Sequence, residues 1–177
     1  VLISDADEIP NLNNDKFTKF DSAVFLQKMY YYKFNLHAYD GLKWKNKVAC
    51  TKSCKFKFFE SVQIVRQFRV RNIPRWRLDR RINRYVEEDG GWHFSYLMND
   101  NEISSKLKRF KHEIEHLKQG KNYSFDSLVD VNKIKNRISN FIDPYERSEV
   151  KIKKVELDKS FPKYIYENKK ILNEYIL

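Results

Sequence analysis

The chain has 177 residues, which is about the length of one domain. Hydrophobic residues make up 41% and aromatic residues 15% of it, so the chain can bury a core and is not intrinsically disordered. Only 4 Gly and 4 Pro exclude collagen-like and low-complexity classes, and no apolar run approaches the ~18 residues of a membrane span. The net charge of +11 favours anionic or phosphate-bearing partners.

The chain begins with a short apolar run, Val1-Leu2-Ile3, which acidic residues follow at once. This run predicts the carboxyl end of a buried parallel strand. A parallel neighbour usually comes from an earlier βα unit, so we expect the chain to be the carboxyl-terminal part of a larger domain.

The first half of the chain predicts short elements separated by turns. Residues 15–20 follow good N-cap residues and predict a short helix. Residues 22–36 are rich in aromatic and β-branched types and predict one or two strands. Asp40-Gly41 indicates a turn. Two further segments fit either a strand or a helix: residues 56–59 and 62–68.

Residues 66–84 are rich in arginine, and Pro74 argues against one continuous helix there. Three interpretations stay open. The segment is a solvated basic surface, it contacts nucleic acid, or one or two arginines anchor a diphosphate or an acceptor. Guanidinium groups match phosphate oxygens bidentately, which makes Arg69 and Arg71 the candidates for the third role.

The second half predicts a strand and two helices. Gly90-Gly91 breaks the chain before an apolar strand at residues 92–98. Apolar residues then recur at three- and four-residue steps, which predicts a helix over residues 102–119. Residues 163–177 predict a terminal amphipathic helix.

The acidic turn Asp5-Ala6-Asp7-Glu8 is the most informative segment. Ligands of open α/β sheets bind at the carboxyl ends of strands. Asp5 and Asp7 can therefore converge on one hard cation, Mg²⁺ or Mn²⁺, which would neutralise a departing diphosphate. The alternative is a solvated acidic turn.

Three blocks stand out in order along the chain: residues 3–10, Ile-Ser-Asp-Ala-Asp-Glu-Ile-Pro, residues 91–96, Gly-Trp-His-Phe-Ser-Tyr, and residues 161–165 with Asn168. They resemble blocks of glycosyltransferase family 17, which includes the β-1,4-mannosyl-glycoprotein 4-β-N-acetylglucosaminyltransferases. The first block resembles the signature of that family, and the second resembles its Gly-Trp-His-x-Ser block. Residues 106–107 and 110–113 resemble the continuation of the second block, and residues 161–165 with Asn168 resemble the end of the family sequence.

The resemblance implies an α/β fold: a GT-A-like mixed sheet flanked by helices, with the amino-terminal nucleotide-binding part missing. Residues 1–177 would form a single partial glycosyltransferase domain. Its metal and diphosphate motif would lie at 3–10, its acceptor-side strands at 22–98 and its helical end at 102–177. The implied reaction is a metal-dependent, inverting transfer of N-acetylglucosamine from UDP-N-acetylglucosamine to a glycan hydroxyl, such as that of a β-mannose, with Mn²⁺ or Mg²⁺ as cofactor.

Site residues follow from the same resemblance. Asp5 and Asp7 would hold the metal and the diphosphate, and we expect Trp92 and His93 near them. An inverting transfer needs a group that deprotonates the acceptor hydroxyl. The candidates for catalytic groups are Glu113, His93 and Asp89, with Glu88 as a rival. The candidates for substrate contacts, each of which is otherwise a core or surface residue, are Trp92, Asn35, Trp44 and His112.

Two other histidine and cysteine patterns have to be weighed. His112, Glu113 and His116 fit the H-E-x-x-H expression of zinc proteases, although no histidine follows them. A third ligand would then be Asp126, Asp130 or Glu146, and the alternative is a solvated helix face. The two cysteines, Cys50 and Cys54, are plain thiols, a local disulfide or an adventitious metal site.

Two other functions stay open from the sequence. The first alternative is a basic nucleic-acid-binding module, although the sequence contains no helix-turn-helix, RNP or zinc-finger spacing. The second alternative is a fragment that is inactive on its own. The expected partners are a nucleotide sugar and a glycan acceptor, and no transmembrane segment is predicted. The expected location is cytoplasmic for a microbial source and the Golgi lumen for a eukaryotic one.

Overall fold

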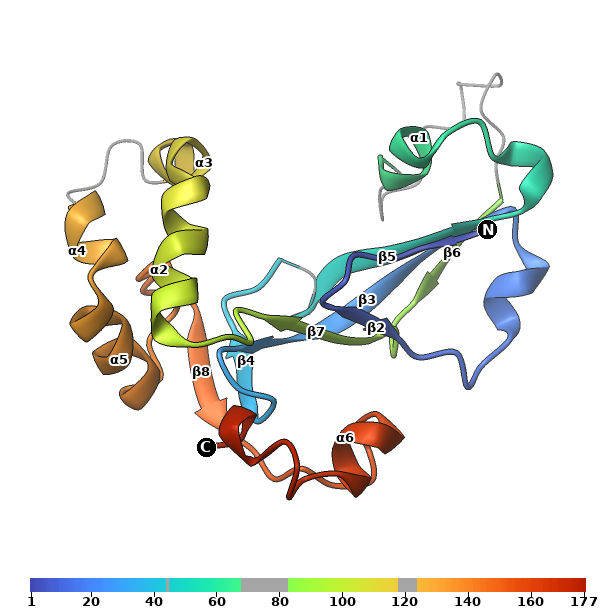
Figure 1. Cartoon of the computed structure of the whole chain (residues 1–177). Helices are drawn as coiled ribbons and strands as arrows, with labels where there is room; N and C mark the ends of the chain where they lie inside the picture. The colour runs from blue at the N-terminus through green and yellow to red at the C-terminus, as the bar shows by residue number, and fades with distance from the viewer. Residues whose placement is uncertain (44, 68–82, 118–123) are drawn as a thin grey trace. The chain divides into compact units, whose positions relative to one another are not determined.

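The computed structural model describes residues 1–43, 45–67, 83–117 and 124–177 (Figure 1). They form a mixed α/β structure with a mixed sheet and helices, which confirms the expected class. The chain divides into two compact units, which we call the first unit (Val1–Met29 and Leu42–His93) and the second unit (Tyr30–Gly41 and Phe94–Leu177). Nothing in this division decides whether residues 1–177 form one domain, so that prediction stays a prediction.

The sheet of the first unit combines antiparallel and parallel pairs. Strand β3 (Ser22–Tyr31) pairs antiparallel with β5 (Val48–Cys54) on one side and parallel with β6 (Arg84–Glu87) on the other. Strand β1 (Leu2–Ile3) pairs antiparallel with β5, with Leu2 opposite Ser53. These strands lie side by side in Figure 1.

The opening strand differs from the expectation. Among the described strands β1 pairs only with β5, the pairing is antiparallel, and Leu2 keeps 41% of its surface exposed. The prediction of a buried parallel strand is therefore wrong. An apolar run of three residues cannot distinguish a buried strand from an edge strand. The continuous apolar pattern of the first and the alternating pattern of the second become different only over a longer segment.

A second pair of strands joins the two sequence blocks that lie about eighty residues apart. Strand β2 (Glu8–Pro10) pairs antiparallel with β7 (Gly91–Ser95), with Glu8 opposite His93 and Pro10 opposite Gly91. The Gly90 N–H donates to the Leu26 carbonyl at 3.0 Å, which ties this pair to β3. The strand predicted at 92–98 is confirmed, but it ends at Ser95.

Short helical turns flank the sheet of the first unit. The helix predicted at 15–20 is a single 3-10 turn, η1 (Lys16–Lys19). Segments 56–59 and 62–68 are helical rather than extended, as η2 (Phe56–Phe58) and α1 (Val62–Arg66). Ser61 caps α1 by accepting a hydrogen bond from the Ile64 N–H at 3.3 Å. Buried Val65 packs against Val24 and Cys54, which fixes α1 on the sheet.

The described part of the second unit contains an antiparallel strand pair and several helices. Strand β4 (Leu36–Asp40) pairs with β8 (Lys151–Lys154). Buried side chains of the helices, such as Ile103, Leu107, Leu128 and Ile134, contribute to its core. The helices of this unit that precede β8 are α2 (Asp100–Arg109), α3 (Lys111–Leu117), α4 (Phe125–Val129) and α5 (Val131–Ser139).

Two predicted helices are interrupted. The helix expected at 102–119 is split at Phe110, the C-cap of α2, whose side chain is 44% exposed. The helix expected at 163–177 ends after α6 (Lys163–Glu167), and a short 3-10 turn, η4 (Asn173–Tyr175), follows. Asn168 is the C-cap of α6, and both its backbone N–H, at 3.1 Å, and its side-chain amide, at 2.8 Å, donate to the Tyr164 carbonyl. Across the described ranges, no helix is long and apolar enough to cross a membrane.

The aromatic run after Met29 is buried in the second unit, as expected for core residues. Tyr31 and Tyr32 are at most 4% exposed, and Phe94 packs against Phe34 with ring centroids 5.0 Å apart. Burial raises the pKa of the Tyr31 hydroxyl from 10.0 to about 12. Burial also raises the pKa of Tyr32 and of Tyr96.

We expect these tyrosines to make the fold sensitive to alkali. Unfolded tyrosine loses its proton near pH 10, whereas Tyr31 in the folded chain holds it to about pH 12. The contribution of Tyr31 to the free energy of unfolding is therefore complete below pH 10. It is lost as the pH rises from 10 to about 12, and the loss is about 2 to 3 kcal/mol. Urea unfolding followed by circular dichroism across this range measures the loss. The Tyr31→Phe variant should show a smaller loss, and an equal loss in both proteins would contradict the prediction.

Candidate functional site

The acidic residues lie in a tight loop between β1 and β2, in the first unit. The Glu8 N–H donates to the Asp5 carbonyl at 3.1 Å, and the Asp5 N–H donates to Glu8 Oε2 at 3.1 Å. The Ser4 hydroxyl donates to the Glu8 carbonyl at 3.0 Å. These bonds hold the loop in one conformation, and they therefore fix the direction in which each carboxylate points.

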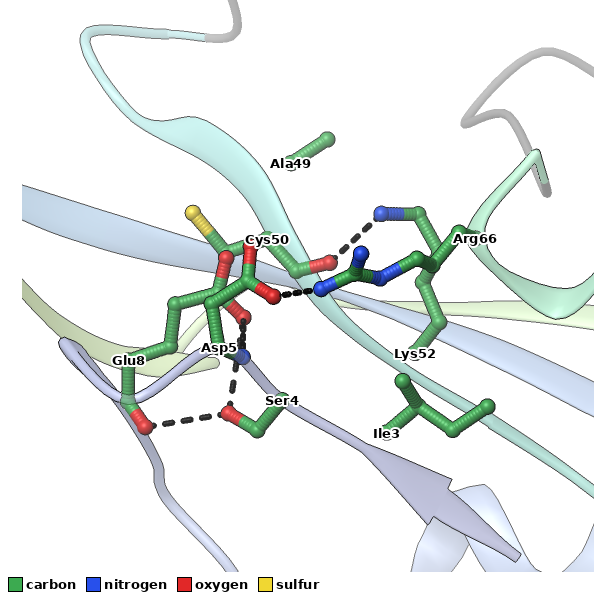
Figure 2. A pocket seen from close by; sticks show the side chains of 8 residues that line it. All are labelled: Ile3, Ser4, Asp5, Glu8, Ala49, Cys50, Lys52 and Arg66. Atoms are coloured by element: carbon green, nitrogen blue, oxygen red, sulfur yellow. Dashed lines mark hydrogen bonds and ion pairs between the residues drawn. The ribbon is translucent and has the colours of Figure 1, made fainter. Parts of the chain in front are cut away.

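Asp5 faces a cation of the arginine-rich segment. Its Oδ1 forms an ion pair with Arg66 Nη2, and both side chains are about half exposed (Figure 2). Arg66 is the last residue of α1, which Val65 holds on the sheet. The packing of α1 thus places a guanidinium group beside the acidic loop.

A polar cavity of about 310 Å³ opens beside this loop (Figure 2). Two carboxylates, Asp5 and Glu8, and two cationic side chains, Lys52 and Arg66, contribute to its wall. The Lys52 ammonium group donates to the Cys50 carbonyl at 2.7 Å. The full lining consists of Ile3, Ser4, Asp5, Glu8, Ala49, Cys50, Lys52 and Arg66.

Asp7 lies beside His93 of strand β7. Asp7 Oδ2 is 3.4 Å from His93 Nε2, and the other ring nitrogen, Nδ1, is 3.1 Å from Cys50 Sγ. The antiparallel register of β2 and β7 explains this closeness, because it sets Glu8 opposite His93. The expectation that His93 lies near the acidic turn agrees with this arrangement.

Glu8, Cys50 and His93 form a cluster whose candidate ligand atoms all lie within 4.8 Å of one another. Burial of Cys50 raises the pKa of its thiol far above the ordinary value, and the negative charge of Glu8 adds to this effect. The sequence leaves Cys50 as a plain thiol, a partner in a local disulfide or a ligand of an adventitious metal site, and does not pair it with Glu8 or His93. Only knowledge of the strand pairing could have revealed this cluster. Strand β5 pairs with β1 and strand β7 pairs with β2, and the acidic loop connects β1 and β2.

The two aspartates predicted as joint metal ligands have different partners. Asp5 pairs with Arg66 at the cavity, whereas Asp7 pairs with His93. In the described part of the chain, the group of three candidate ligands contains Glu8 and neither aspartate. Their joint role in metal binding therefore stays a prediction.

Several other predicted site residues lie in the same unit. Asp89 Oδ2 accepts a hydrogen bond from the Asn11 amide at 3.1 Å. Glu88 pairs with Lys45 at 2.9 Å, and the Lys45 hydrogen bond and charge lower the pKa of Glu88. Trp92 is partly buried and lies opposite Ile9 in the β2–β7 pair.

Other predicted residues lie in the second unit. Asn35 is 3% exposed, and its amide exchanges hydrogen bonds with the backbone of Leu177 at 3.0 and 2.9 Å, which is a structural role. His112 is an exposed residue of α3, and Glu113 and His116 belong to the same helix. The side chains of Glu113 and His116 lie outside the description, as do Trp44, Arg69 and Arg71.

Two of the three candidate third ligands of a zinc-protease site have structural roles. Asp130 caps α5 by accepting a hydrogen bond from the Lys133 N–H at 2.9 Å. Glu146 pairs with buried Arg137 at 2.8 Å. Asp126 is an exposed residue in the first turn of α4. These positions give the H-E-x-x-H interpretation no support.

Comparison with protein-family models, with curated proteins and with solved structures finds no match to this chain. The resemblance to glycosyltransferase family 17 therefore rests on the sequence motifs alone.

Proposed function

We propose that the chain carries the metal and diphosphate motif of an inverting glycosyltransferase with a GT-A-like fold. It would transfer N-acetylglucosamine from UDP-N-acetylglucosamine to a glycan hydroxyl. The observation that carries the proposal is the register of β2 and β7, which sets Glu8 opposite His93. It brings together one residue from each of the two most specific blocks of the family resemblance, and Glu8 of this pair lines a polar cavity.

The residues around the cavity fit a metal-bound diphosphate. The carboxylates of Asp5, Asp7 and Glu8 supply the oxygen ligands that Mn²⁺ and Mg²⁺ prefer. When bound, such an ion would stabilise the negative charge of the departing diphosphate. Arg66 and Lys52 line the same cavity and can bind phosphate oxygens. Arg66 would then share its guanidinium group between Asp5 and the phosphate.

His93 is the candidate that we would test first as the group that accepts the acceptor proton. Its imidazole lies in the same unit as the acidic loop, and Asp7 at 3.4 Å can orient the ring. An imidazole that a carboxylate orients is a common general base. Asp89, the rival in this unit, is engaged by Asn11.

The Asp7→Asn variant tests the proposal. We expect transfer from UDP-N-acetylglucosamine to depend on Mn²⁺ and to fall about 100- to 1000-fold in this variant, because the site loses a carboxylate that would hold the cation stabilising the departing diphosphate. Mass spectrometry of products from a panel of simple glycosides, with and without Mn²⁺, measures the transfer.

Asp15→Asn is the matched control, since Asp15 is an exposed carboxylate of the same unit without a side-chain capping bond. It should keep the wild-type rate. Transfer that survives Asp7→Asn or needs no divalent ion would overturn the proposal, and so would the absence of any transfer by the wild-type chain.

A further inference from the structure

We propose that Glu8, Cys50 and His93 form a binding site for a borderline-soft divalent cation of the zinc class. This site does not rest on the proposed transferase function, but it shares Glu8 and His93 with it, and an ion bound here would take His93 out of the role of proton acceptor. Its ligand atoms lie within 4.8 Å of one another, and they come from three different strands, β2, β5 and β7.

The kinds of donor determine which ion fits. A cysteine sulfur and an imidazole nitrogen suit Zn²⁺ and related ions, whereas Mg²⁺ and Mn²⁺ prefer sites made of oxygen. In a tetrahedral zinc site the sulfur and nitrogen ligands lie roughly 3.5 Å apart. Cys50 Sγ and His93 Nδ1 are 3.1 Å apart, so they need to separate by only a few tenths of an ångström. The Cys50 proton would leave to solvent when the ion binds.

Asp7 supports the ring of His93 in the way that is typical of metal sites. A metal-binding histidine usually directs its other ring nitrogen at a carboxylate, which fixes the ring and its tautomer. Here Nδ1 faces Cys50, while Nε2 lies 3.4 Å from Asp7 Oδ2. Asp7 therefore occupies the outer position that such a histidine requires.

The glutamate is also held by a second layer. Glu8 Oε2 accepts hydrogen bonds from the Asp5 N–H and from the Thr51 hydroxyl, each at 3.1 Å. The amide of fully buried Gln27 in turn donates to Thr51 Oγ1 at 3.0 Å. This chain of bonds leads from the core to the ligand and holds the carboxylate beside Cys50.

The cavity gives an ion a way in. Glu8 and Cys50 both line it, and Cys50 itself is only 6% exposed (Figure 2). Three protein ligands leave the fourth position of a tetrahedral ion for water or for a ligand atom in the cavity. The site thus has the ligand number of an open zinc site rather than of a closed structural one.

Cobalt(II) is the probe, because a thiolate bound to it gives a charge-transfer absorption band that oxygen and nitrogen ligands do not give. We expect the wild-type chain to bind one Co²⁺ with this band and to exchange it for one Zn²⁺. The Cys50→Ser variant should lose the band and bind both ions at least about tenfold more weakly.

Cys54→Ser is the matched control, since Cys54 is the other buried thiol and packs against Val24 and Val65 instead. It should keep the band. The His93→Gln variant, which retains the thiol, should also bind Zn²⁺ at least about tenfold more weakly, and it provides the test if Cys50→Ser does not fold. Circular dichroism establishes that each variant is folded.

The proposal is overturned if the wild-type chain shows no sulfur charge-transfer band, if Cys50→Ser keeps it, or if only Cys54→Ser loses it. These measurements use no nucleotide sugar. A failed cobalt experiment therefore leaves the transferase proposal standing, and a failed transfer assay leaves the zinc-class site standing.

Discussion

Replacing Asp143 with Ala is expected to lower the free energy of unfolding by about 3 to 5 kcal/mol, because the change leaves the partly buried guanidinium group of Arg147 without its carboxylate partner. Asp143 is fully buried. Its carboxylate accepts hydrogen bonds from Arg147 Nη2 at 2.7 Å and Nε at 2.9 Å, and from the Tyr145 N–H at 3.0 Å. Burial alone would lower the pKa of Arg147, but the hydrogen bonds and charge of Asp143 raise it, so Arg147 keeps its positive charge in the fold.

Urea unfolding of three variants checks this expectation. The Glu167→Ala variant removes a carboxylate with the same i,i+4 spacing to a base, Lys163, but that pair is exposed and should cost less than about 0.5 kcal/mol. The double variant Asp143→Ala with Arg147→Leu should recover part of the loss, since no charge is then left unpaired. An Asp143→Ala loss as small as that of Glu167→Ala would contradict the argument.

The sequence predicted best those elements whose signal is local and long. The aromatic segment that became β3 covers ten residues, and the Gly90-Gly91 break before β7 is marked by its glycines. The capping box of α2, in which Asn99 and Glu102 bond each other's backbone, agrees with the expected helix in that region. The break at Phe110 was missed because the apolar spacing continues through it.

The candidate site was only partly predictable, because its contacts are long-range. The acidic loop and His93 were identified from two motifs, and the β2–β7 register brings them together. The closeness of Cys50 to His93 could not be predicted, because the two residues are forty-three positions apart in the chain. The spacing of two cysteines along the chain does not show which other strand lies beside each of them.

Gly91→Ala should have the other large effect, because Gly91 sits where β2 meets β7. Its φ of +114° is a conformation that residues with a side chain rarely adopt. A Cβ there would lie 2.1 Å from the Ile9 carbonyl oxygen and 2.7 Å from the Asn11 nitrogen, and both are backbone atoms that cannot turn away. The strain and the clash together should cost on the order of 3 kcal/mol or more.

The same substitution should disturb the candidate site, since relieving the clash requires β2 to move away from β7. His93 lies opposite Glu8 in that register, so the Co²⁺ site should weaken together with the fold. Asn101→Ala, at an exposed position in the first turn of α2, is the control and should stay within about 0.5 kcal/mol of the wild type. Urea unfolding and Co²⁺ titration of both variants give the comparison. A Gly91→Ala chain with wild-type stability would show that β2 and β7 do not pair in this register.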